Sequence, residues 1–263
     1  MNVADAGRAT FPYARSQENP RKPRVILIAG FPNSGTTIVS YLLSQHPEVF
    51  ASGELVHFPV RQLKPTKMCS CGSPAATCPF WSEVLARLGD LRHAVDAVKM
   101  PALYRIICAM SGARVVVDVA HDLHAVRSIR ALDGIDLSLV HLSRRPMAVL
   151  RSRLALNCRQ GELRPYTFAY AWRALTHGRR LHTYERRLGA CVRADAPAAL
   201  RASYEEICQL PAAPLSRIGR LCGLDFSAVT ARLEGGEPLR VPAHMIRGNA
   251  RLRSKSSVRL VAR

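Results

Sequence analysis

A buried strand that runs straight into a glycine loop and a helix is the feature that most constrains this fold. Residues 24–29 (RVILIA) form an unbroken apolar run, which is typical of a strand covered on both faces of a parallel sheet. The next loop places Gly30 and Gly35 at the spacing of a phosphate-binding loop. Backbone amides of such a loop, together with the N-terminus of the following helix, bind anions. The start of the chain therefore predicts a P-loop-like α/β fold.

The rest of the chain alternates between strand and helix patterns. Further strands are predicted at residues 49–51, 114–119, 136–142 and 198–202. Helices are predicted at residues 36–45, 80–88, 93–110, 123–132, 166–188 and 215–222. This alternation predicts a central, largely parallel sheet flanked by helices. We expect a single α/β domain at residues 23–238 with a cysteine-containing insertion, preceded by a flexible segment (1–22) and followed by a basic tail (239–263).

The charge balance is strongly basic, with 38 Lys and Arg residues against 19 Asp and Glu residues and a formal net charge of +19. Such a surface attracts nucleic acid, anionic lipid or a phosphorylated small molecule. No apolar run approaches the ~18 residues of a membrane span. The N-terminus also lacks the apolar centre of a signal peptide. We therefore expect a cytoplasmic protein with reduced cysteines.

The loop after the first strand offers an anion the backbone amides of Ser34, Gly35, Thr36 and Thr37, together with hydroxyl groups. In nucleoside triphosphatases a Lys of this loop holds the β- and γ-phosphates, and Thr36 stands at that position here. A kinase or NTPase is therefore the weaker alternative, and a shorter anion such as a substituted 5′-phosphate is favoured. An ordinary tight turn is the alternative without a binding function.

A second candidate anion site follows the strand predicted at residues 136–142. Arg144 comes directly after this strand, at the carboxyl end of the sheet, where α/β proteins bind ligands. Ser152 lies eight residues later, on the next predicted helix. An oxyanion between the two side chains would accept a charge-assisted pair of hydrogen bonds and a hydroxyl bond. A surface arginine and a helix-face serine are the alternative.

Both sites together resemble the sulfotransferases that use 3′-phosphoadenosine 5′-phosphosulfate (PAPS), including bacterial and carbohydrate-type members. The resemblance covers residues 24 to 253. The motifs that carry it are Gly30-Phe-Pro-Asn-Ser-Gly-Thr-Thr37, Leu142-Ser-Arg144-Arg-Pro-Met-Ala-Val-Leu-Arg-Ser152 and His244-Met-Ile-Arg-Gly248-Asn249-Ala-Arg-Leu-Arg253.

The resemblance implies a cofactor, PAPS with 3′,5′-ADP as product, and residues that hold it. The 5′-phosphosulfate is expected at Asn33, Ser34, Gly35, Thr36 and Thr37, and the 3′-phosphate at Arg144 and Ser152. The tail is expected to complete this site with Gly248, Asn249 and either Arg251 or Arg253. The sequence departs from the family in three places. Relatives usually have Lys or Arg at the position of Asn33, they often have Lys at the position of His121, and the tail arginines here are offset in register.

An acceptor hydroxyl must lose its proton during transfer, so a general base is needed near the loop. Carbohydrate-type relatives have a Glu after the second strand, which implies Glu54 as the base, with His57 as the second candidate. A salt-bridged or capping carboxylate is the alternative for Glu54. This chemistry requires no metal, and we assign none to the catalytic site.

Three cysteines, Cys69, Cys71 and Cys78, lie close together before a Pro-Phe-Trp sequence. Thiolates at such spacing are able to bind zinc, although common structural sites have two-residue gaps and four ligands. His57 is a candidate for the fourth ligand. Packed thiols, a disulfide and a metal site all stay open. Similar stretches occur in bacterial relatives, and we interpret this one as an insertion that borders the acceptor pocket.

The sequence therefore predicts a sulfotransferase that acts on a hydroxyl of a sugar, lipid or secondary metabolite. Arginines along the helix at 166–188 favour a solvated basic face, and recognition of an acidic acceptor or of an anionic membrane surface is the functional alternative. A basic nucleic-acid-binding protein is the non-enzymatic alternative. Nucleic-acid binding would not explain why Arg144 and Ser152 occur as a pair, so we expect no nucleic-acid partner. An inactive relative is a further alternative, because Asn33 lacks the usual charge.

Overall fold

A five-stranded parallel sheet forms the centre of the structure, which is a computed structural model that describes residues 22–56, 58–60, 63, 67–195 and 198–261. Its order is β2-β3-β1-β4-β5. The strands are β1 (Arg24–Ala29), β2 (Val49–Gly53), β3 (Val115–Ala120), β4 (Asp136–Ser143) and β5 (Ala199–Ser203). The predicted P-loop-like α/β class with a parallel sheet flanked by helices is confirmed. The predicted flexible segment at 1–22 lies outside the described residues, apart from Lys22.

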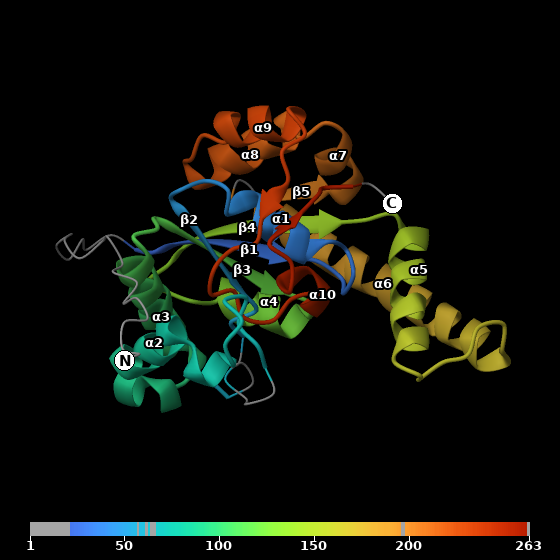
Figure 1. Cartoon of the computed structure of the whole chain (residues 1–263), viewed down its shortest axis with the longest axis horizontal. Helices are drawn as coiled ribbons and strands as arrows, with labels where there is room; N and C mark the ends of the chain where they lie inside the picture. The colour runs from blue at the N-terminus through green and yellow to red at the C-terminus, as the bar shows by residue number, and fades with distance from the viewer. Residues whose placement is uncertain (1–21, 57, 61–62, 64–66, 196–197, 262–263) are drawn as a thin grey trace, which may run out of the picture.

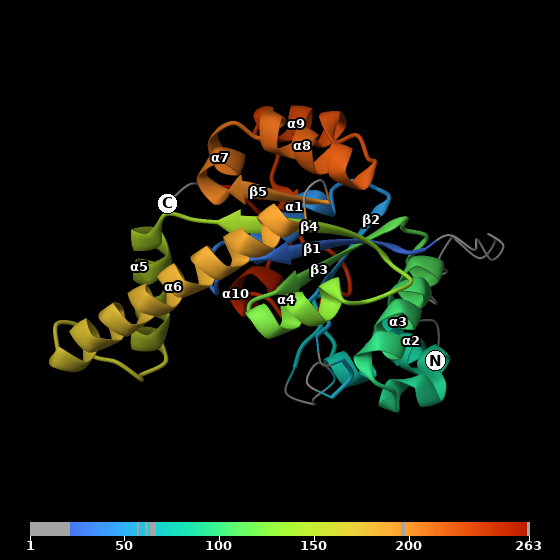
Figure 2. The ribbon, with the colours of Figure 1, turned by 180° about the vertical axis from the view of Figure 1, so that it is seen from behind.

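Helices cover both faces of this sheet (Figures 1 and 2). They are α1 (Thr36–Leu43), α2 (Pro79–Leu88), α3 (Asp96–Ser111), α4 (Leu123–Arg130), α5 (Pro146–Arg159), α6 (Phe168–Ala194), α7 (Tyr204–Gln209), α8 (Ala212–Cys222), α9 (Ser227–Glu234) and α10 (Ala250–Arg253). Short 3-10 turns occur at Ala75–Thr77 and Gly89–His93, and β6 (Leu239–Arg240) pairs with β7 (Ser257–Val258). No described helix is long and apolar enough to cross a membrane.

The continuous apolar sequence of β1 is explained by burial on both faces. Val25, Leu27 and Ala29 pack into the core on the side of α3 and α4. Ile26 and Ile28, which alternate with them, pack into a second core that includes side chains of α1 and α8. Side chains of a strand alternate between the two faces, so a strand between two helical layers has to be apolar throughout.

Because all five strands are parallel, their carboxyl ends meet at one edge of the sheet. The residue directly after each strand lies at this edge. These residues are Gly30, Glu54, His121, Arg144 and Tyr204. The sheet therefore gathers the loop glycine, the candidate base Glu54, His121 and the candidate phosphate-binding Arg144 from distant parts of the sequence.

The basic tail crosses the end of β2 and so reaches the same edge. The Ile246 amide donates a hydrogen bond to the Ser52 carbonyl (2.9 Å), and the Glu54 amide donates one to the Ile246 carbonyl (3.3 Å). The contact is so close that a Cβ on Gly53 would lie 1.8 Å from the Ile246 oxygen. Glycine is required there, and its φ of +91° is also in the left-handed region.

Candidate active site

A cavity of about 680 Å³ lies at the carboxyl edge of the sheet. Most of the residues predicted to bind the cofactor or to catalyse transfer line it: Asn33, Gly35, Thr36, Thr37, Glu54, Arg144, Ser152, Gly248, Asn249 and Arg251. Ser34 is a fully buried residue of the loop, and neither Ser34 nor Arg253 lines the cavity. His57, the second candidate base, is outside the described residues. The structure thus brings two distant sequence motifs and the tail to one cavity.

The glycine loop owes its shape to two residues with left-handed backbones, Asn33 (φ 76°) and Gly35 (φ 97°). A Cβ at Gly35 would lie 2.4 Å from the Tyr204 ring, so no larger residue fits there. Asn adopts this conformation more readily than a long cationic side chain does, which gives a physical reason for Asn33. The Ser34 hydroxyl is fully buried and has no hydrogen-bond partner among the described residues.

Arg144 links the second anion site to the loop. Its Nη1 donates a hydrogen bond to the Asn33 carbonyl (3.1 Å), and its guanidinium carbon lies 4.6 Å from the centre of the Tyr204 ring. This cation–π contact holds the planar guanidinium in one orientation. The two candidate anion sites are therefore neighbours that face the same cavity.

Helix α5 supplies further cavity residues from one face. Pro146 occupies its first turn, where the missing amide hydrogen costs nothing. Ser152, Leu156 and Arg159 then recur at intervals of four and three residues and line the cavity together with Arg153. The sequence analysis missed Arg153 and Arg159. The helical spacing from Ser152 was the signal that could have identified Arg159.

Glu54 lies between two cationic side chains. Its Oε2 is 3.1 Å from Nε of Arg247 and its Oε1 is 3.5 Å from Nε2 of His121. Burial raises the pKa of Glu54, but the hydrogen bond and charge of His121 and the charge of Arg247 outweigh burial, so the pKa is lowered overall. Arg247 was not selected from the sequence, although it stands inside the tail motif.

His121 has a hydrogen-bond acceptor at each ring nitrogen. Its Nδ1 is 2.8 Å from the Gly30 carbonyl, and its Nε2 faces Glu54. Burial lowers the pKa of His121, but hydrogen bonding to Glu54 and the Glu54 charge raise it above its ordinary value. The protonated ring is thereby favoured, and it places a positive charge where the related enzymes have a Lys.

A buried carboxylate, Asp118, fixes the chain beside Glu54. It accepts hydrogen bonds from the Leu55 amide (2.9 Å), the Val119 amide (2.7 Å) and the Tyr104 hydroxyl (2.6 Å). Burial raises the pKa of Asp118 to about 6, against the opposing effect of these hydrogen bonds. Asp118 therefore holds the segment after β2 in register with β3.

The tail contacts the helix that follows the loop. The Asn249 amide donates to the Thr37 hydroxyl (3.1 Å), and the Asn249 side chain accepts from the Arg251 amide (3.1 Å) to cap α10. Arg251 lines the cavity, whereas the Arg253 guanidinium donates to the Met68 carbonyl. Of the two candidate tail arginines, the structure therefore places Arg251 at the cavity.

Comparisons with solved structures agree with this architecture. The chain is similar to the sulfotransferase domain from the curacin biosynthetic pathway, at 19% identity over 90% of this chain and 85% of that chain, with a TM-score of 0.54. It is also similar to the sulfotransferase domain of the Synechococcus PCC 7002 olefin synthase (19% identity, 82% and 78% coverage, TM-score 0.49). A third similar structure is a sulfotransferase from Alicyclobacillus acidocaldarius (15% identity, 77% and 81% coverage, TM-score 0.49). At 19% identity, the likeness to the curacin-pathway domain shows the fold alone.

A comparison with curated proteins finds no match. The profile of a protein family, described as the sulfotransferase family, matches residues 23–228. This match spans most of the chain and includes the glycine loop, Glu54, Arg144 and Ser152. The chain therefore belongs to the sulfotransferase family.

Proposed function

We propose that this enzyme transfers the sulfuryl group of PAPS to an acceptor hydroxyl, with Glu54 as the general base. The observation that carries the proposal is a single cavity lined by the glycine loop, by Arg144 with Ser152, and by Glu54. One nucleotide with phosphates at both ends would engage both anion sites. Sulfuryl transfer depends mainly on positioning and on stabilising developing charge, which such a cavity supplies.

The residues present fit this cofactor. The loop amides at residues 34–37, at the N-terminus of α1, would hold the 5′-phosphosulfate. The buried hydroxyl of Ser34 has no partner among the described residues and would gain one. Arg144 and Ser152 would hold the 3′-phosphate. When bound, PAPS supplies the sulfuryl group that is transferred.

Glu54 suits the role of proton acceptor because its lowered pKa keeps it ionised at neutral pH. Arg247 and His121 orient its two oxygens, which fixes the direction from which it accepts the proton. These two cations would also supply charge near the transferred group, where Asn33 replaces the usual Lys or Arg. This arrangement favours an active enzyme over an inactive relative.

The tail at residues 239–263 would complete the cofactor site of the domain at 23–238. Gly248, Asn249 and Arg251 line the cavity, which supports this division of the chain. Arg253 stays a weaker candidate because it donates to the Met68 carbonyl.

The acceptor proposal is a hydroxyl of a sugar, a lipid or a secondary metabolite, handled in the cytoplasm. Contact with an anionic membrane is supported by exposed aromatic side chains where α6 begins, namely Tyr166, Phe168 and Trp172. Exposed arginines follow on the same helix, and aromatic and basic side chains together favour a lipid interface. Helix α5 and the N-terminal part of α6 project away from the sheet, so the start of α6 is accessible, whereas the C-terminal part of α6 packs on the sheet (Figure 2).

A thermal-shift titration tests the proposal with 3′,5′-ADP, ATP, ATP with Mg²⁺ and a generic DNA duplex. We expect a saturable stabilisation by 3′,5′-ADP that exceeds the effect of the other three ligands. Stronger stabilisation by ATP with Mg²⁺ would instead support a kinase or NTPase. Stabilisation by DNA alone, declining steeply with salt, would support a nucleic-acid-binding protein. Release of 3′,5′-ADP from PAPS in the presence of hydroxyl acceptors then separates an active enzyme from an inactive one.

A further inference from the structure

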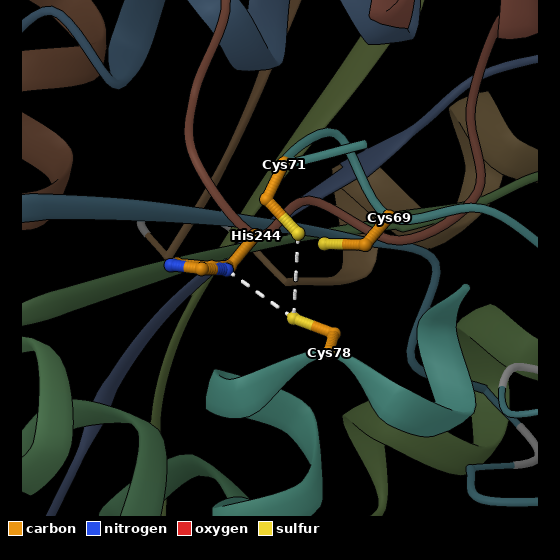
Figure 3. A group of neighbouring side chains, drawn as sticks. All are labelled: Cys69, Cys71, Cys78 and His244. Carbon is orange, nitrogen blue, oxygen red and sulfur yellow. Dashed lines mark hydrogen bonds between the residues drawn. The ribbon is translucent and has the colours of Figure 1, made fainter. Parts of the chain in front are cut away.

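A second cluster of reactive side chains lies beside the catalytic cavity but outside its lining. Cys69, Cys71, Cys78 and His244 point toward one another, and one ligand atom from each lies within 4.8 Å of all the others (Figure 3). The Cys71 and Cys78 sulfurs are 3.6 Å apart, and the Cys78 sulfur is 3.3 Å from Nδ1 of His244. Three residues come from the insertion and one from the tail.

The Cys71–Cys78 and Cys78–His244 separations lie close to the edge lengths of a tetrahedral metal site. Zinc–sulfur bonds of about 2.3 Å and zinc–nitrogen bonds of about 2.0 Å place neighbouring ligand atoms about 3.5–3.8 Å apart. A disulfide would instead need sulfurs at about 2.05 Å, and all three cysteines are free. Three thiolates and one imidazole are a ligand set that zinc uses in structural sites. We propose that Cys69, Cys71, Cys78 and His244 bind one zinc ion.

Local structure in the insertion positions the three cysteines. A tight turn closes when the Gly72 amide donates to the Cys69 carbonyl (3.1 Å), which brings Cys69 and Cys71 to the same place. Cys78 precedes Pro79 at the start of α2, so the helix fixes its position. Cys69 and Cys78 are buried, whereas Cys71 lies at the surface.

His244 is held in an unfavourable backbone conformation that directs its ring into the cluster. Its φ is 61°, and such a conformation persists only where surrounding contacts impose it. The Trp81 indole donates to the His244 carbonyl (2.6 Å), and the His244 ring stacks on Phe80 at 5.2 Å and 12°. Simple packing of thiols would not require an imidazole nitrogen aimed at them. His57, the candidate fourth ligand from the sequence, lies outside the described residues; among the described residues, His244 joins the three cysteines.

The zinc ion would have a structural role, because four protein ligands leave no position for substrate. It would fasten the tail to the domain directly before the catalytic segment. The next residue, Met245, exchanges hydrogen bonds with Ser70, which lies inside the cysteine cluster. Arg247 follows and pairs with Glu54. The metal would therefore fix the position of Arg247 beside the candidate base without taking part in transfer.

The metal content of the full-length wild-type protein tests this inference. We expect one zinc ion per chain after purification without chelator and removal of loosely bound metal. Replacement by Co²⁺ is expected to give the strong visible absorption of a tetrahedral site together with a thiolate charge-transfer band. The variants Cys78→Ser and His244→Asn should lose most of the zinc, whereas Cys158→Ser, which removes a half-buried thiol of α5, should keep it.

Three results would overturn the proposal. Two of them come from wild-type protein and therefore do not depend on whether a variant folds. One is wild-type protein that holds far less than one zinc ion after saturation and gives no thiolate band with Co²⁺. Another is a thiol titration of the denatured protein, in chelator and without reductant, that detects six reactive thiols instead of the eight expected from the sequence. Such a result would indicate a disulfide. The third is zinc retention in Cys78→Ser and His244→Asn equal to that in Cys158→Ser.

Discussion

Replacing Arg144 with alanine removes a side chain that joins the two candidate anion sites of the cavity. In the structure the guanidinium is already oriented by the Tyr204 ring and by the Asn33 carbonyl. Little conformational entropy is therefore lost when it binds an anion. We expect Arg144→Ala to weaken binding of 3′,5′-ADP while binding of 5′-AMP, which lacks the 3′-phosphate, changes little.

The size of this effect follows from the contacts that would be lost. A hydrogen bond to a charged group contributes about 1.5–3 kcal/mol, and a guanidinium forms two such bonds with one phosphate. Allowing for the remaining contact with Ser152 and for solvent, the loss should be about 3–4 kcal/mol, which corresponds to a Kd raised roughly 100- to 1,000-fold. Arg144→Lys keeps the charge but loses the planar pair of donors, so an intermediate effect is expected.

Isothermal titration calorimetry with both nucleotides measures this difference. The matched control is Arg145→Ala. Arg145 is the next residue in the chain and carries the same charge, but its side chain is exposed and does not line the cavity. The control is expected to keep the wild-type preference for 3′,5′-ADP. The reasoning fails if Arg144→Ala weakens both nucleotides equally, or if Arg145→Ala has the same effect as Arg144→Ala.

Three further changes test the rest of the site. Glu54→Gln should lower kcat by about 10²- to 10⁴-fold, as expected for loss of a general base. The Kd for 3′,5′-ADP, measured by calorimetry, should stay nearly unchanged, and full turnover by this variant would refute the assignment. Gly35→Ala should lower the free energy of unfolding in urea by about 1–3 kcal/mol, because a Cβ would lie 2.4 Å from Tyr204. The control is Gly236→Ala, at a glycine whose φ of +78° is also positive but which has open space around it; this variant should lower the free energy of unfolding by less. The pair of Glu54 and His121 should stabilise the fold most between about pH 4.5 and pH 6.5, the ordinary pKa values of the two groups. The lowered pKa of Glu54 means that its contribution is lost as pH falls below this window, and the raised pKa of His121 means that its contribution is lost as pH rises above it. Urea unfolding measured from below to above this window should show both slopes in wild type. His121→Gln should lose the slope on the alkaline side and show a smaller slope on the acid side, where Arg247 still faces Glu54; equal slopes in the two proteins would contradict the pairing.

The strands that build the sheet could be predicted because their burial leaves a local signal. Residues 24–29 are apolar at every position, and β1 has these bounds. By contrast, β2 was expected at residues 49–51 and extends to Gly53. After a shift in register, the last residue of β2, Gly53, pairs with Asp118 of β3. Gly53 also forms a bridge with Ile246, which is almost two hundred residues away in the sequence. A contact between such distant segments leaves no local pattern in the sequence.

The same reasoning explains which site residues were found. Those in short motifs, such as Ser34 and Arg144, could be selected because a resemblance to a family preserves spacing. Arg247 was passed over because its role depends on the tail crossing β2, which only the three-dimensional structure shows. Likewise, His57 was the candidate partner of the cysteines because it lies near them in the sequence. His57 is outside the described residues, and among those that are described the tail brings His244 to the cysteines.

A crystal structure with 3′,5′-ADP tests most directly whether one cavity holds both ends of a single nucleotide. We expect the 5′-phosphate on the amides of residues 34–37 and the 3′-phosphate on Arg144 and Ser152, with Glu54 facing the open end of the 5′-phosphate. A nucleotide bound elsewhere on the basic surface, or bound with its 3′-phosphate away from Arg144, would contradict it.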